Sequence, residues 1–103
     1  MPKIDDIKVG DEVSGVYHVQ EVEMRHFANK PGRYLHMRIS DETGTIYAVC
    51  FDPDLIPFTI KQGAKVGFKN AQAKDFKGDK RLYFYPGSVF KIGDIEQDQE
   101  TLT

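Results

Sequence analysis

The sequence predicts an all-β protein, a barrel or sandwich formed by one domain. Segments that alternate apolar and polar residues recur along the chain, and Gly, Pro or Asp turn signals separate them. No window carries the long 3.6-residue period of an amphipathic helix. The 103 residues, of which 40% are hydrophobic, are enough for one compact core and too few for two domains.

The first expected strand is unusually long and covers residues 13–26. Its apolar positions change phase between Val19 and Val22, and this shift predicts a bulge or bend of the kind that strongly coiled barrel strands need. Gly15 supplies a flexible point nearby. A polar loop with a Pro-Gly turn signal is expected to follow over residues 27–33.

The next two expected strands, residues 34–40 and 46–51, each have one apolar face, and a tight Asp-x-x-Gly turn over residues 41–44 joins them. The residues expected to point inward are Leu35, Met37, Ile39, Ile46, Ala48 and Cys50. Those expected to point outward are Tyr34, His36, Arg38, Tyr47, Val49 and Phe51. One face of this hairpin is therefore predicted to be core and the other to be solvated.

The second half of the chain begins with a strand stop at residues 52–54. Residues 55–62 predict an irregular plug or a short helical turn that covers one end of the barrel. The later expected elements are a fourth strand over 65–74, a loop over 75–79, a fifth strand over 80–85 and a short extended piece over 88–92. The acidic, polar residues 94–103 are predicted to be a disordered tail, so the folded domain is expected to span residues 1–93.

Five strands with a plug between the third and the fourth match the order of the oligonucleotide/oligosaccharide-binding (OB) fold. A five-stranded SH3-like barrel is the structural alternative, and the long bent first strand favours the OB fold. The strand, Asp-x-x-Gly turn and strand over residues 34–52 resemble the nucleic-acid-binding OB-fold superfamily. That superfamily includes the single-strand-binding domains of replication protein A, the anticodon-binding domain of class II aminoacyl-tRNA synthetases and the N-terminal domain of HD-domain exoribonucleases. The similarity extends over residues 4–90.

The resemblance implies two positions at which aromatic rings stack on bases. The ring that closes the third strand corresponds to Phe51. The second position lies in the fifth strand, where the simplest alignment selects Leu82 and strand alternation favours Tyr83 or Tyr85. An exoribonuclease would need an additional HD metal domain, which does not fit within 103 residues.

Charge is segregated along the chain although the net charge is only −2. Residues 24–38 carry +4 with no acid, and residues 61–81 carry +5, while the intervening and flanking segments are acidic. In an OB fold the two basic segments contain the loops that flank the usual binding groove. We therefore expect an acidic chain to present a local basic channel, provided that folding brings the two segments together.

These observations predict a binding site for single-stranded DNA or RNA, in which bases stack on rings and cations follow the phosphates. The candidate residues are Arg25, Lys30, Arg33, Tyr34, His36, Arg38, Tyr47, Phe51, Phe76, Lys77, Lys80, Arg81 and Tyr83. Each also has a plainer explanation, because sheet aromatics often only pair across strands and loop lysines often only solvate a surface. The acidic isoelectric point, near 5.9, favours an alternative, an OB domain that binds protein. An accessory domain of a larger nucleic-acid enzyme is a further alternative.

The sequence predicts no catalytic residues, no cofactor and no metal site. His18, His26, His36 and Cys50 lack any zinc-ligand spacing, and no phosphate loop or nucleophile elbow occurs. Cys50 alternates with inward positions and is expected to be a core residue. A single cysteine and the lack of an apolar N-terminal or membrane-length segment predict a cytoplasmic protein without a membrane partner.

Overall fold

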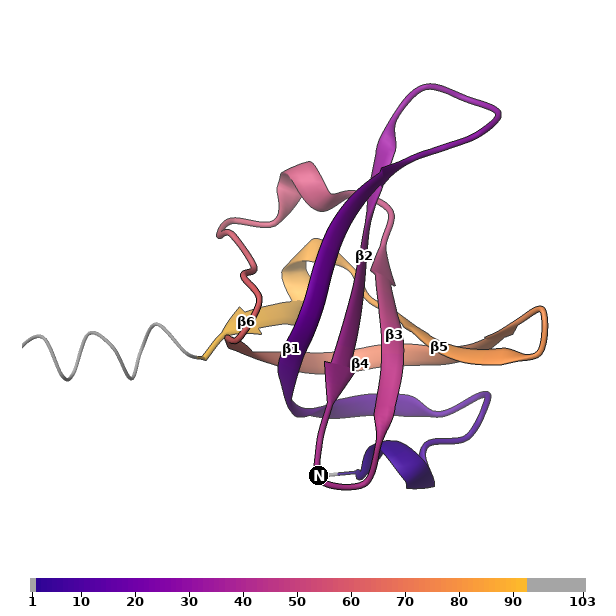
Figure 1. Ribbon diagram of the computed structural model, residues 1–103, viewed down its shortest axis with the longest axis vertical. Coiled ribbons are helices and arrows are strands. Elements are labelled where there is room, and N and C mark those ends of the chain that lie inside the picture. The colour runs from indigo at the N-terminus through magenta and orange to yellow at the C-terminus, as the bar shows by residue number, and fades with distance from the viewer. Residues whose placement is uncertain (1, 93–103) are drawn as a thin grey trace, which may run out of the picture.

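The computed structural model describes residues 2–92, and its regular elements are strands and single turns of 3-10 helix. The strands are β1 (Glu12–His26), β2 (Arg33–Ser40), β3 (Thr45–Cys50), β4 (Lys65–Phe76), β5 (Asp79–Tyr83) and β6 (Val89–Lys91). Strands β1-β2-β3-β5-β4 are hydrogen-bonded in that order, and β1 also pairs with β4, so five strands close into a barrel (Figure 1). The all-β, five-stranded prediction is confirmed, and the predicted disordered tail lies outside the described residues.

Strand β1 pairs with two strands because it bends. Its first half pairs with β4 and its second half with β2, and the two halves meet at His18. The register shifts between Val19 and Glu21, where the phase change predicts a bulge, and shifts again between Val13 and Gly15. A bulge increases strand twist, so both irregularities help one strand turn the corner of the barrel.

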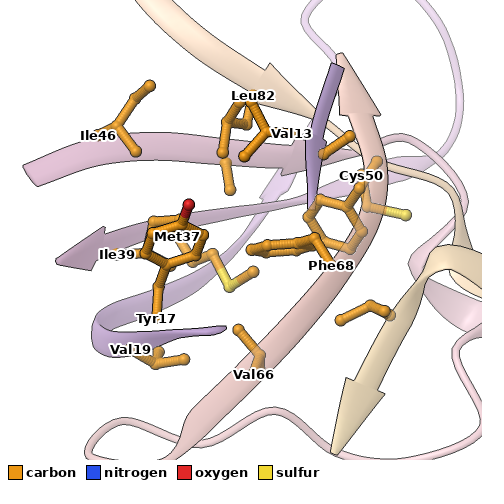
Figure 2. Close-up of a cluster of buried hydrophobic side chains, with 14 of the residues drawn as sticks. Val13, Tyr17, Val19, Met37, Ile39, Ile46, Cys50, Val66, Phe68 and Leu82 are labelled. Atoms are coloured by element: carbon orange, nitrogen blue, oxygen red, sulfur yellow. The ribbon is translucent and has the colours of Figure 1, made fainter. Parts of the chain in front are cut away.

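The barrel interior is filled by side chains from every strand of the ring (Figure 2). The six residues of β2 and β3 predicted to point inward are all buried. In β1 the buried positions are Val13, Tyr17 and Val19, whereas Val16 is only half-buried, because the bulge at Gly15 changes which side chains face inward. The Tyr17 hydroxyl donates a hydrogen bond to the Pro2 carbonyl at 2.7 Å, which satisfies its polar end.

The segment between β3 and β4 is the expected plug. Its only regular piece is the 3-10 turn η2 (Pro53–Leu55), after which Ile60 is buried and Ile56 and Phe58 pack against the core. A second 3-10 turn, η1 (Ile4–Asp6), brings Ile4 into the core, and Ile7 follows it there. The sequence analysis did not anticipate this N-terminal contribution, because three residues are too few to show a period.

Two hairpins project from the barrel body, one between β1 and β2 and the other between β4 and β5 (Figure 1). The first is closed by the Phe27 amide, which donates to the Gly32 carbonyl at 3.1 Å, and Gly32 adopts a φ of +110° that favours glycine. The second turns at Lys77 and Gly78, both with positive φ. These hairpins belong to the two basic segments of the sequence.

Candidate nucleic-acid interface

The outer face of the barrel is fixed by the pairing of β3 with β2 and β5. Tyr47 is paired with Arg81 on β5, and Val49 is paired with Tyr83. Leu82 between them is fully buried, at 0% exposure. Tyr83 and not Leu82 therefore lies on the outer face at the second position that the resemblance implies, because Leu82 points into the core and its neighbour must point outward.

Four rings form a continuous row on this face, which we call the ring row: Phe27, Tyr34, Phe51 and Tyr83. Phe51 is its centre, with ring centroids 6.0 Å from Phe27 and 5.6 Å from Tyr83, both in stacked geometry. Tyr34 lies 6.1 Å from Phe51 in a tilted arrangement. Phe51 is 52% exposed, so a large part of its ring is available to a ligand.

A lysine from each basic segment lies at either end of the ring row. The Lys30 ammonium is 4.6 Å from the centroid of Phe27, and the Lys74 ammonium is 5.9 Å from that of Tyr83. Cations at these distances interact favourably with the ring faces. The two basic segments therefore converge on one surface, as the sequence analysis required.

A second group of cations and rings lies on the same face, around Arg81. Its guanidinium carbon is 4.4 Å from the centroid of Phe76 and 5.7 Å from that of Tyr47. The Lys77 ammonium lies 5.4 Å from Phe76. The Arg81 Nε is buried and has no hydrogen-bond partner among residues 2–92. This Arg81 cluster brings together four of the predicted site residues and places the tip of the β4–β5 hairpin beside β3.

His36 and Val49 lie beneath the rings, and here the expectation of a fully solvated outer face was wrong. Val49 is 2% exposed and His36 6%, because the rings around them exclude water. The His36 ring lies 4.7 Å from that of Tyr47. Burial is the main cause that lowers the pKa of His36, and the positive charges of Arg25 and Arg81 lower it further. These causes favour the uncharged imidazole of His36, whose ring packs against that of Tyr47.

The buried imidazole predicts a loss of stability in acid. Between the ordinary pKa of histidine, about 6.5, and the lowered pKa in the fold, the unfolded chain binds more protons. The free energy of unfolding should therefore fall as the pH drops through this interval, and His36→Phe should flatten the slope. Urea denaturation at several pH values measures it. His26→Phe removes an exposed imidazole instead, and an equal flattening in that control would contradict the assignment.

Two predicted cations on this face are held by acids of β1. Arg38 forms an ion pair with Glu21 at 2.9 Å, and Arg25 forms one with Glu23 at 3.1 Å. These pairs are solvent-exposed, so each contributes little stability and can exchange for a phosphate. The β1 edge of the face is nevertheless less basic than residues 24–38 suggest, because Glu21 pairs across the sheet and Glu23 pairs along its own strand.

Arg33 and Lys80 do not join the ring row or the Arg81 cluster. Arg33 lies two positions before the inward-facing Leu35 of β2, so its side chain leaves the sheet on the inner side. Its guanidinium forms an ion pair with Asp54 of the plug at 2.5 Å. The Lys80 ammonium donates hydrogen bonds to the carbonyls of Ile4 and Ile7, which lie on the core side of β5. Lys80 therefore does not reach the candidate surface. Arg33 is paired with Asp54 but still lines the pocket between the β1–β2 hairpin and Phe51.

Two open pockets flank Phe51, and they share Phe51 and Asp52 in their linings. The pocket on the β4–β5 side has a volume of about 380 Å³ and also includes Gln72, Lys74 and Tyr83. The pocket on the side of the β1–β2 hairpin has a volume of about 580 Å³ and also includes Phe27 and Lys30. The exposed ring of Phe51 thus separates two recesses of a size that accommodates a nucleobase.

The sequence analysis did not include Phe27 in the candidate site, and it placed Lys74 among the cations that flank the groove without including it among the candidate site residues. Phe27 was assigned to a polar loop, although the outward alternation of β1 through Glu21, Glu23 and Arg25 reaches it with the same period of two. The signal for Phe27 was strand parity carried one step beyond the expected end of the first strand. Lys74 is the last residue of the expected fourth strand, and its pairing with Arg81 on β5 places it on the outer face.

The fold is shared with several solved structures. The crystal structure of the p204 HINb domain aligns with a TM-score of 0.71 at 21% identity, over 89% of this chain and 47% of the other. A murine DNA-binding protein bound with double-stranded DNA aligns with a TM-score of 0.67 at 19% identity, over 88% and 47%. The second OB-fold domain of replication protein A from Methanococcus maripaludis aligns with a TM-score of 0.68 at 15% identity, over 88% and 93%.

The barrel, its plug and these alignments define the chain as an OB-fold domain. It spans about half the length of the HINb structure that it matches. No protein-family model matches the sequence, and no curated protein matches it. Within residues 2–92 there is no group of three or more potential metal ligands, and no helix there is long and apolar enough to cross a membrane.

Proposed function

We propose that this domain binds single-stranded DNA or RNA on the face that carries the ring row. The observation that carries the proposal is the arrangement of Phe51 between two further rings, with Lys30 and Lys74 from separate hairpins at the ends. Exposed aromatic faces bind bases by stacking, and cations beside them neutralise the phosphates of the same strand. The OB-fold neighbours, one of them bound to DNA, support binding of nucleic acid in general.

A single strand suits this surface better than a duplex does. The bases of a duplex are stacked on one another, so their faces are closed to protein rings, whereas an unpaired base can leave its neighbours and stack on Phe51. The exposed faces of Phe51 and the adjacent recesses offer such a base both a platform and room. The function proposed is binding without catalysis, cofactor or metal, in the cytoplasm.

The two end lysines should determine the salt dependence of binding. Each cation that neutralises a phosphate of a single strand contributes about −0.7 to the slope of log K against log salt concentration. We therefore expect Lys30→Ala with Lys74→Ala to reduce the magnitude of the slope by about 1.4. Fluorescence anisotropy of a labelled oligothymidine, titrated at several salt concentrations, measures this slope.

The matched control removes the same charge elsewhere, as Lys61→Ala with Lys69→Ala. Within residues 2–92 neither of these lysines lies over a ring. The control should lower the slope much less than the end-lysine variant does. Equal slopes in the two double variants would mean that the net electrostatic field of the protein attracts nucleic acid, and that the lysines at the ring row make no specific phosphate contacts.

A protein-binding role is the second candidate function. Large apolar side chains outside the ring row are exposed, notably Met24 on β1 and Leu55 on the plug, which lines the same pocket as Phe27 and Phe51. Exposed apolar residues at one end of a barrel are typical of interaction surfaces. If oligonucleotides fail to bind at low salt, this candidate, either as a free module or as a domain of a larger nucleic-acid enzyme, becomes the better explanation.

A further inference from the structure

The carboxylate of Asp52 occupies an unusual position for a surface that binds a polyanion. Asp52 follows Phe51 directly and lines both pockets that flank the exposed ring. The backbone leaves the strand at this residue, with φ −125° and ψ 58°. A negative charge beside the central stacking ring repels phosphates, so its presence calls for a reason.

The fold itself gives the Asp52 side chain no task. Asp52 occupies the N-cap position of η2, but its side chain makes no capping hydrogen bond. Within residues 2–92 its carboxylate forms no ion pair and accepts no hydrogen bond, whereas nearby Asp54 pairs with Arg33 and Asp41 accepts the amide of Ile4. All the acceptor capacity of the Asp52 carboxylate is therefore available to a ligand.

The base edges differ in what they offer such a carboxylate. Guanine presents two adjacent donors, N1–H and the 2-amino group, which a carboxylate can accept together in bidentate geometry. Adenine and cytosine each present one amino group beside an acceptor nitrogen, and thymine and uracil present one N–H between two carbonyl oxygens. Only guanine therefore offers a donor to each oxygen of the carboxylate. Each of the other bases places one of its own acceptors opposite a carboxylate oxygen.

We propose that Asp52 reads the edge of the base stacked on Phe51 and makes the site selective for guanine. This inference rests on the proposed function and adds a base preference to it. Stacking on Phe51 fixes the plane of the base, and the adjacent carboxylate then lies beside its edge. The charge-assisted bonds to N1–H and the amino group offset the repulsion between the carboxylate and the backbone of the strand.

The test is a set of oligothymidine octamers in which one central base is thymine, guanine, adenine or cytosine. A bidentate contact of this kind discriminates by at least about fivefold, so the guanine octamer should bind at least about fivefold more tightly than the others. In Asp52→Asn the amide presents one acceptor and one donor, which suits adenine and cytosine, so the guanine advantage should be lost and those two should bind most tightly. Asp52→Ala should abolish the differences.

Asp75→Asn is the matched control, because Asp75 lines one of the same pockets but its carboxylate already accepts the Gly78 amide. It should raise the affinity for all four octamers alike through the loss of one negative charge and should keep the guanine preference. If the wild-type protein binds all four octamers equally, or if Asp52→Asn leaves the order unchanged, the guanine inference is overturned while the proposed function stands. If no octamer binds, both are overturned.

Discussion

Replacing Phe51 by alanine is expected to weaken the binding of a short single strand by about five- to 160-fold. The ring is 52% exposed and lies between two other rings, so it is the platform that a ligand base meets first. Stacking of a base on an aromatic side chain contributes roughly 1–3 kcal/mol by alanine substitution, which sets this range. Anisotropy titration with oligothymidine at low salt measures the change in Kd.

The stability of the Phe51→Ala protein should change little, because a half-exposed ring outside the barrel leaves no core cavity when it is removed. Phe90→Ala is the matched control, since Phe90 is 47% exposed on β6 and makes no ring contact with the ring row. It should bind normally. Normal binding by Phe51→Ala, or an equal defect in Phe90→Ala, would show that the ring row is not the binding surface.

The adjacent residues Leu82 and Tyr83 should give opposite phenotypes when each is replaced by alanine. Leu82 is fully buried in the barrel, so Leu82→Ala should lower the free energy of unfolding by about 2–5 kcal/mol. In a domain of this size that loss lowers Tm by at least about 8 °C. Differential scanning calorimetry measures it, and the folded Leu82→Ala protein should retain its oligonucleotide affinity.

Tyr83→Ala should instead weaken oligonucleotide binding and destabilise the domain less than Leu82→Ala does. Its ring stacks on that of Phe51 at 5.6 Å, and Lys74 lies over it, so the substitution removes one end of the ring row. The pair of variants tests which side of β5 faces the ligand. If Leu82→Ala loses binding while Tyr83→Ala retains it, the register of β5 against β3 is wrong.

Much of the candidate site followed from strand parity. The clean alternation of residues 34–40 and 46–51 predicted that Tyr34, Tyr47 and Phe51 share the outer face, and the structure places them there. Parity says which side of a sheet a residue occupies but not what covers it. For this reason the burial of His36 and Val49 beneath neighbouring rings could not be predicted.

The partners of the cations were also beyond the sequence. Arg38 lies in a segment without acids, yet it pairs with Glu21 of β1, which the antiparallel register of β1 and β2 brings directly opposite to it. Arg25 pairs with Glu23, which lies two positions earlier on the same strand and just outside the basic segment. Lys80 belongs to the second basic segment, yet its ammonium donates to carbonyls near the N-terminus. The pairings of Arg38 and Lys80 join residues that are distant in the chain, so charge counted along segments overstates the charge of a surface.

The sequence by itself determined the all-β class, the five strands and plug in their order, the bulge in β1 and the outward direction of Phe51. These features are local, because they depend on the period of apolar residues and on turn residues that act within a few positions. Only the tertiary structure decided that Lys30 and Lys74 meet at one row of rings, that Tyr83 and not Leu82 is its end, and that Asp52 stays unpaired beside Phe51. Those facts depend on barrel closure between β3 and β5, a parallel contact between segments some 34 residues apart whose register no local pattern specifies.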